Sequence, residues 1–119
     1  MAGRGELEQA VLQVLWDNPA GITARDVTSA LPDRNLALTT VLTVLGRLGA
    51  KGLATRDELA HPHLYRAAAT REEYIADIML DALGRAPDRE AALTRFLGSV
   101  TSTDTDHLRR MLRHRPPRR

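Results

Sequence analysis

The most informative pattern of apolar and polar positions lies between residues 36 and 56. Four apolar side chains recur there at intervals of three and four residues, which places them on one side of a helix: Val41, Val44, Leu45 and Leu48. Gly52 predicts the end of this helix, because glycine adopts the left-handed conformation of a C-cap at little cost. Two strand-like runs follow, at residues 53–56 and 64–67, with a polar turn between them. The pattern therefore predicts a helix that leads directly into a short hairpin.

The residues before this stretch predict two more helices. Residues 6–17 carry an apolar stripe at helical spacing, made by Leu7, Ala10, Val11, Val14 and Leu15. Trp16 lies near the end of this helix, and its indole N–H should reach water or a carbonyl. Thr23 and Asp26 have the spacing of a capping box and open a helix that runs to about residue 30. Ile22 is expected to pair with the base of the hairpin. Three helices and a hairpin predict a winged helix-turn-helix, whose third helix enters the DNA major groove while the hairpin rests on the backbone.

The rear of the chain predicts three further helices. Thr70 and Glu73 form a stronger capping box, and Asp88 and residues 102–106 begin two more helices. A segment of this size cannot close a core alone. It therefore packs on the front domain or on a second copy, and we favour the second copy. Its apolar side chains are the predicted dimerisation residues: Ile75, Ile78, Met79, Leu83, Leu93, Phe96, Leu97, Leu108, Met111 and Leu112.

These patterns give a mainly α fold with a small β-hairpin wing. We expect a DNA-binding domain at 1–70, a three-helix dimerisation domain at 71–113 and a disordered basic tail at 114–119. Neither a signal peptide nor a membrane span is visible, so we expect a cytoplasmic protein without membrane insertion. The absence of cysteine excludes disulfides and thiolate metal sites.

Overall charge does not locate a DNA-binding face. Of the 17 basic and 15 acidic residues, residues 1–70 carry seven of each, and the basic excess lies near the C-terminus. The third helix is more informative, because its polar side has hydroxyls and cations but no carboxylate. We predict base contacts from Thr39, Thr40 and Thr43. We predict phosphate contacts from Thr23, Arg47, Lys51, Arg56 and Arg66.

The sequence resembles the penicillinase repressors, the BlaI/MecI family, which are related to the CopY repressors. LEQAVLQVLW is similar to the family's opening helix, and TTVLTVLGRLGAKGL is similar to its recognition helix and the exit from that helix. Tyr65-Arg66 is similar to the end of family wings, and the segments ALTRFLGSV and LRRML resemble the family's dimerisation region.

The resemblance implies a homodimeric repressor that binds inverted-repeat operators of β-lactam-resistance or cell-wall genes. It also implies that a membrane sensor-protease relieves repression by cutting the repressor. Well-known members are cut at an Asn–Phe bond, and the matching bond here is Arg95–Phe96. The copper branch carries paired cysteines, so copper sensing by that route is excluded.

Other features of the sequence bear on three alternatives to a DNA-binding repressor of this family. His61 and His63 in the wing could serve a metal-responsive repressor, although two histidines seldom form a site without a third ligand. A protein-interaction adaptor could use the same scaffold without DNA, but it has no need of cations beside a threonine face. An enzyme is not expected, because no Ser–His–acid pattern, phosphate loop or paired buried carboxylates is visible. No cofactor or metal is predicted.

Overall fold

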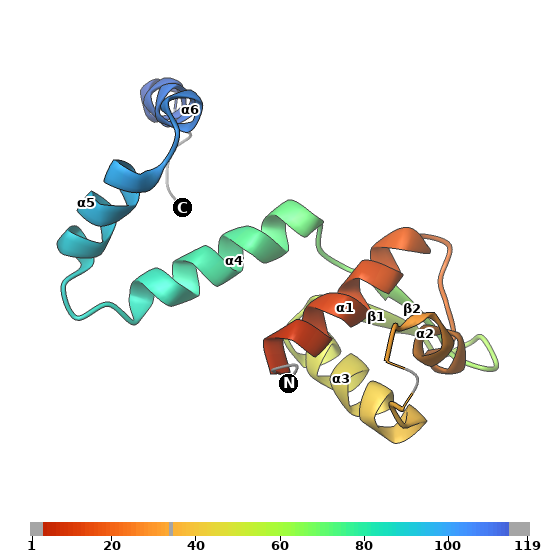
Figure 1. The fold of residues 1–119 in the computed structure, drawn as a ribbon. Helices are drawn as coiled ribbons and strands as arrows, with labels where there is room; N and C mark the ends of the chain where they lie inside the picture. The colour runs from red at the N-terminus through yellow and green to blue at the C-terminus, as the bar shows by residue number, and fades with distance from the viewer. Residues whose placement is uncertain (1–3, 34, 115–119) are drawn as a thin grey trace. The chain divides into compact units, whose positions relative to one another are not determined.

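The computed structural model describes residues 4–33 and 35–114. The chain divides into two compact units, Met1–Ala76 and Asp77–Arg119. The first unit contains helices α1 (Arg4–Asp17), α2 (Ala24–Ala30) and α3 (Leu38–Ala50), followed by strands β1 (Ala54–Asp57) and β2 (Leu64–Ala67) (Figure 1). The start of α4 (Arg71–Gly84) also belongs to it. The mainly helical fold with a hairpin wing is confirmed.

Local sequence signals explain the ends of these helices. Thr23 is the N-cap of α2, and its side-chain oxygen accepts from the backbone N–H of Asp26 at 3.1 Å. Ala37 precedes α3 and provides no side-chain cap, as expected for alanine. Gly52 follows α3 with φ at 76°, which is the left-handed conformation predicted for it.

The wing is a two-stranded antiparallel hairpin in which Ala54 faces Ala67 and Asp57 faces Leu64. The first strand begins one residue later than predicted, because the backbone N–H of Leu53 still donates to the carbonyl of Leu48 at the end of α3. Ile22 forms the expected bridge with Tyr65, and each residue donates its backbone N–H to the other's carbonyl. The hairpin is therefore tied to the segment that precedes α2.

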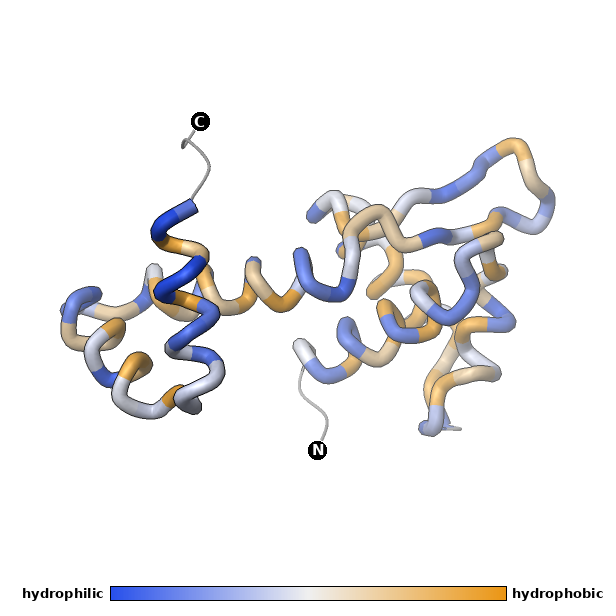
Figure 2. The backbone as a smooth tube through the Cα atoms, turned by 90° about the horizontal axis from the view of Figure 1, so that it is seen from above, coloured by the Kyte–Doolittle hydropathy of each residue, from blue (hydrophilic) through white to orange (hydrophobic). Residues whose placement is uncertain are grey.

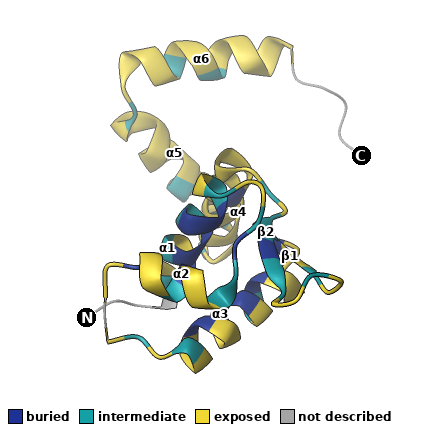
Figure 3. Ribbon diagram, turned by 90° about the vertical axis from the view of Figure 1, so that its right-hand side faces the viewer, coloured by how far each residue is buried: buried dark blue, intermediate teal, exposed yellow. Residues whose placement is uncertain are grey.

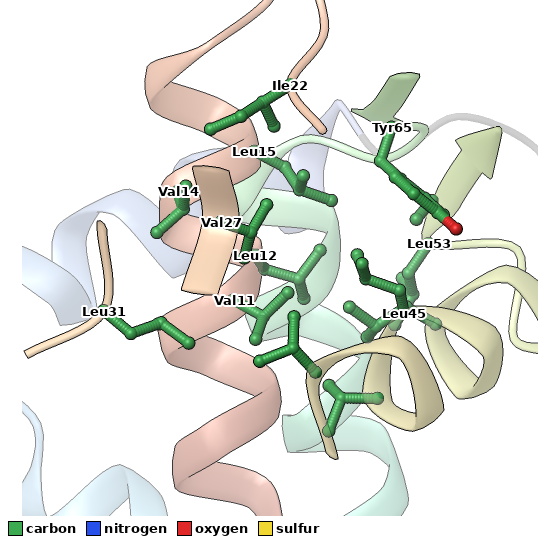
Figure 4. Close-up of a cluster of buried hydrophobic side chains, with 14 of the residues drawn as sticks. Val11, Leu12, Val14, Leu15, Ile22, Val27, Leu31, Leu45, Leu53 and Tyr65 are labelled. Carbon is green, nitrogen blue, oxygen red and sulfur yellow. The ribbon is translucent and has the colours of Figure 1, made fainter. Parts of the chain in front are cut away.

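The core of the first unit lies where α1, α2, α3 and the hairpin meet (Figure 4). The four apolar residues predicted for α3 are all buried, and Tyr65 covers one end of the cluster from β2. Helix α1 is buried over a wider arc than its predicted stripe, since it contacts α2, α3 and β2. Leu12 is fully buried and Glu8 is only 5% exposed, although neither belongs to that stripe.

Aromatic contacts hold the start of α4 against α1. The Trp16 indole N–H donates to the carbonyl of Ala69 at 2.9 Å, and a carbonyl is one of the two partners expected for it. The rings of Trp16 and Tyr74 meet edge to face with centroids 5.9 Å apart, and Tyr74 is buried. Arg71 lies over the indole and donates to the side-chain oxygen of Gln13 at 2.9 Å. The first turn of α4 is therefore part of the front core.

The second unit contains the rest of α4 together with α5 (Arg89–Ser99) and α6 (Ser102–Arg113). Asp88 caps α5 as predicted, whereas the cap of α6 is Thr101, one residue before the predicted cluster. Apolar and polar positions alternate along these helices (Figure 2). Between residues 77 and 114 no side chain is buried, so this described part of the unit has no core of its own (Figure 3).

Residues 115–119 of the predicted basic tail lie outside the described part of the chain. Within the described ranges, no helix combines the length and the apolar character needed to cross a membrane.

Candidate nucleic-acid interface

Helix α3 has three strips of side chains outside its buried face. Helical spacing places Thr40, Arg47 and Lys51 on one edge, and the Lys51 ammonium contacts α1 there. The other edge carries Leu42, Gly46 and Gly49, which line a groove beside the hairpin. Thr39 and Thr43 lie between these edges and are exposed. The predicted polar face thus extends from the centre of the helix toward α1, and an apolar edge faces the wing.

The three threonines predicted to contact bases are all exposed. The Thr43 hydroxyl donates to the carbonyl of Thr39 at 3.0 Å, so its proton is already used within the helix. Its oxygen can still accept a hydrogen bond, and its methyl group can make an apolar contact. Within the described ranges, the hydroxyls of Thr39 and Thr40 make no hydrogen bond and can act as donors.

Lys51 forms an ion pair inside the protein. Its ammonium donates to both oxygens of Glu8, at 2.8 and 3.0 Å, and the Glu8 side chain is 6% exposed while that of Lys51 is 52% exposed. Burial raises the pKa of Tyr74, and the charge of the Glu8 carboxylate raises it further, while the charge of Lys51 lowers it. The predicted phosphate contact of Lys51 therefore competes with a structural role between α1 and the end of α3.

Arg56 and Arg66, the predicted phosphate contacts of the wing, also have internal partners. Arg56 pairs with Glu58 on the same hairpin, and this hydrogen bond and the Arg56 charge lower the pKa of Glu58. Arg66 donates to the carbonyl of Ala20 at 2.7 Å. A guanidinium has five N–H donors, so both side chains keep donors for a phosphate.

Arg47 and Arg25 differ from the other cations of this surface. Neither makes a salt bridge or a side-chain hydrogen bond within the described ranges. Arg47 is half-buried on the α1 edge of α3, and Arg25 is exposed in the first turn of α2 beside Thr23. Arg25 was not among the predicted contacts, although an arginine two residues after the N-cap threonine was a visible signal.

Two open surface grooves lie beside α3. The first has a volume of about 530 Å³ and lies between α3 and the hairpin, where Leu42, Gly46, Arg56 and Tyr65 contribute to its walls. The second is about 280 Å³ and is lined by the start of α2, the start of α3 and the returning strand of the wing. Leu42 and Tyr65 line both grooves. Sequence reasoning missed Leu42, because its residue type does not match a polar contact surface.

The histidines at the wing tip lie close together, with ring centroids 5.7 Å apart. In the described ranges, no group of three or more histidine, cysteine or carboxylate side chains is arranged to hold a metal ion. The geometry therefore offers no support for the metal-responsive alternative.

A three-helix core, a hairpin wing and open grooves beside the third helix define a winged-helix protein. The sequence matches the penicillinase repressor family over residues 4–114. It is 42% identical over 112 residues to the transcriptional regulator BlaI of two Mycobacterium tuberculosis strains, CDC 1551 and H37Rv. Each match covers 91% of this chain and 81% of the relative. The chain belongs to the penicillinase repressor family, whose members regulate transcription and are not enzymes.

Some solved structures are also similar. One is a MarR-family protein from Bacillus stearothermophilus, with 20% identity and a TM-score of 0.47, covering 90% of this chain and 69% of that one. Another is PcaV from Streptomyces coelicolor, with 24% identity and a TM-score of 0.45, covering 90% of this chain and 70% of that one.

Proposed function

We propose that the protein is a sequence-specific repressor that binds an inverted-repeat operator in double-stranded DNA as a homodimer. The observation that carries the proposal is the outer surface of α3. Helix α3 contains no acidic residue, and its exposed side presents threonines, Arg47 and open grooves beside a hairpin. A surface of this kind suits a polyanion that must approach a helix closely.

The proposed contacts divide into two classes. Thr39, Thr40 and Thr43 contact base edges, since they lie on the exposed part of α3. The phosphate contacts come from Thr23, Arg47, Lys51, Arg56 and Arg66. Arg47 is the best supported of these phosphate contacts. It forms no ion pair within the described ranges, so it need not break one to bind a phosphate. Lys51 is the weakest, because a phosphate must compete with the Glu8 carboxylate.

The experiment selects duplexes from a random pool with the full-length chain and then titrates the recovered consensus at several salt concentrations. Arg47→Ala should weaken binding to consensus and random duplexes alike, and it should reduce the slope of log K against log salt by about one unit. Thr40→Ala should instead change discrimination at one or two base pairs. Recovery of no consensus, or wild-type binding by both variants, would contradict the proposed surface.

Dimerisation is proposed through α4, α5 and α6. Eight of the ten predicted dimerisation side chains are between 42% and 68% exposed in the single chain, among them Leu93 at 42% and Leu112 at 68%. Leu83 and Leu108 are half-buried. Three helices with exposed apolar side chains and no buried residue between 77 and 114 need a partner surface, and a second copy supplies an identical one.

We further propose that the operator controls β-lactam-resistance or cell-wall genes and that a membrane sensor-protease relieves repression. The proposal rests on family membership and on the position of the Arg95–Phe96 bond within α5. Helix α5 buries no side chain in the single chain, so unwinding it to expose the bond disrupts few contacts there. Mass spectrometry of the protein from β-lactam-treated cells should find fragments that end at Arg95 and begin at Phe96. Intact protein in derepressed cells would contradict cleavage.

Charge alone no longer distinguishes the repressor from a protein-interaction adaptor. Its discriminating feature was the row formed by Arg47, Lys51 and Arg56, and two of these three cations have carboxylate partners. Membership of a transcription-regulator family favours the repressor. The duplex selection described above separates the two functions, because an adaptor would recover no consensus.

A further inference from the structure

Leu42 is an apolar side chain on the exposed part of α3. The four other apolar residues at the centre of this helix, Val41, Val44, Leu45 and Leu48, are at most 2% exposed, whereas Leu42 is 41% exposed. It lies beside both grooves that separate α3 from the wing and from the start of α2. A side chain in this position contributes less to the core than the buried four and remains available to a ligand of the grooves.

The α3 side of the two grooves offers little polar chemistry for reading bases, and the polar groups of the grooves, such as Arg25 and Arg56, lie on the opposite walls. One turn further along α3, a Cβ atom built on Gly46 would meet no heavy atom within 4 Å, so the helix surface there is bare and open. The neighbouring Thr43 hydroxyl already donates its proton to the Thr39 carbonyl. The wing edge of α3 therefore presents the Leu42 side chain, bare backbone and, next to them, the Thr43 methyl group.

The DNA major groove offers one apolar group on its base edges, the 5-methyl group of thymine. We propose that Leu42 is a specificity-determining residue that contacts a thymine 5-methyl group in each operator half-site. The inference rests on the proposed function and deepens it, because it names a base and the chemical group through which that base is recognised. Leu42 discriminates by apolar contact, and hydrogen bonds from Thr39 and Thr40 act at other positions.

The test removes the methyl group from the DNA without changing its hydrogen bonds. In the duplex recovered from the random pool, each thymine in turn is replaced by deoxyuridine at the symmetric positions of both half-sites. At one position the full-length protein should bind the deoxyuridine duplex more weakly. The loss of one buried methyl contact weakens binding about four-fold per half-site, and two half-sites together give about fifteen-fold. Replacement at thymines outside the half-sites is the control.

Protein variants connect this sensitivity to Leu42. Leu42→Ala should bind the thymine and deoxyuridine duplexes with less than about a two-fold difference, because the apolar partner of the methyl group is gone. Leu42→Met is the matched control, since it keeps a similar apolar volume and should keep the sensitivity of the wild type. Thermal unfolding verifies that each variant is folded, and Leu42→Gln replaces the alanine variant if that variant is not.

Two results would overturn the inference while leaving the proposed function intact. One is a consensus that the wild type binds equally well with deoxyuridine at every thymine. The other is a methyl-dependent position whose fold-change persists unaltered in Leu42→Ala, because another residue then reads that methyl group. Failure of the wild type to select any consensus would overturn the proposed function and the inference together.

Discussion

At the scale of single residues, the charged groups around α3 differ in what they already bind. Lys51 and Arg47 lie four residues apart on the same edge of the helix, yet only Lys51 reaches a buried carboxylate. The Glu8 side chain is 6% exposed and accepts both of its hydrogen bonds from Lys51. Lys51 is therefore a structural residue of the front domain as well as a proposed DNA contact.

Lys51→Ala should lower the free energy of unfolding by about 1–3 kcal/mol, because it leaves a buried carboxylate without its partner. The lower part of that range is favoured, since half of the lysine side chain is in water and the pair is partly screened. Urea denaturation at neutral pH measures the change.

Two variants control this stability prediction. Arg47→Ala removes a cation from the same edge and should change stability much less, since it breaks no ion pair within the described ranges. Adding Glu8→Gln to Lys51→Ala should recover part of the loss, because an amide is less costly to bury than an unpaired carboxylate. Equal stability of Lys51→Ala and wild type would show that the pair is not formed in solution.

At the scale of elements, the junction between β2 and α4 is held by a complete capping box. The Thr70 side chain accepts from the N–H of Glu73 at 3.0 Å, and the Glu73 carboxylate accepts from the N–H of Thr70 at 3.0 Å. The bond from the Thr70 backbone is the main cause of a lowered pKa at Glu73. Because Trp16 and Tyr74 pack just beyond this cap, it fixes where α4 leaves the front domain.

Glu73→Ala should lower the thermal midpoint of unfolding at neutral pH, and the loss should depend on pH. A carboxylate whose pKa is depressed in the folded state stabilises the protein above its unfolded pKa, about 4.3, and this contribution is lost as the pH falls through the folded value. The difference between the variant and the wild type should therefore be constant near neutrality and shrink below about pH 4. Melting curves across this range test the prediction.

Glu72→Ala is the matched control for the cap. Glu72 also lies in the first turn of α4 but makes no hydrogen bond to Thr70 in the described ranges. Its removal should have a smaller effect than the removal of Glu73. A Glu73→Ala difference that does not change with pH would contradict the role of the ionised cap.

At the scale of the whole molecule, the two units differ in how they are stabilised. Among its described residues, the front unit has a core of fifteen buried apolar residues, to which α1, α2, α3, the hairpin and the start of α4 contribute. The described part of the rear unit buries no side chain. If two copies join through this unit, the second DNA contact becomes intramolecular, which would raise the affinity of a helix whose proposed base contacts are threonines and a leucine.

Phe96→Ala in the full-length chain should shift the protein from dimer to monomer. Phe96 is 43% exposed in the single chain, and its ring is the largest of the proposed dimerisation side chains. Because each dimer contains two such rings, the dissociation constant should rise by at least about 100-fold. Sedimentation velocity over a concentration series measures the shift.

Leu59→Ala is the matched control for this change. Leu59 is 92% exposed at the wing tip and lies outside the three rear helices, so its removal should leave the dimer unchanged. Operator affinity of Phe96→Ala should fall in parallel with dimer content. A Phe96→Ala protein that remains dimeric at the same concentrations would contradict the proposed dimer surface.

The sequence by itself determined the local architecture. The approximate helix positions, the left-handed Gly52 and the cap at Thr70 were all predicted, because they depend on residue spacing or on preferences that act within a few positions. The hairpin followed from the same short-range signals. Its bridge from Ile22 to Tyr65 was also predicted, although these two residues are far apart in the sequence. Family membership was predicted from the segments that contain these signals.

Only the tertiary structure decided which side chains remain available for function. Lys51 is 43 residues from Glu8 in sequence, and Trp16 is 53 residues from Ala69, so no local pattern reveals either pair. The first pair means that a phosphate must compete with a buried carboxylate for Lys51. The burial of Leu12 and Tyr74 likewise depends on neighbours from distant elements. Leu42 is a leucine in an amphipathic helix, and only the position of the hairpin shows that its side chain lies beside two open grooves.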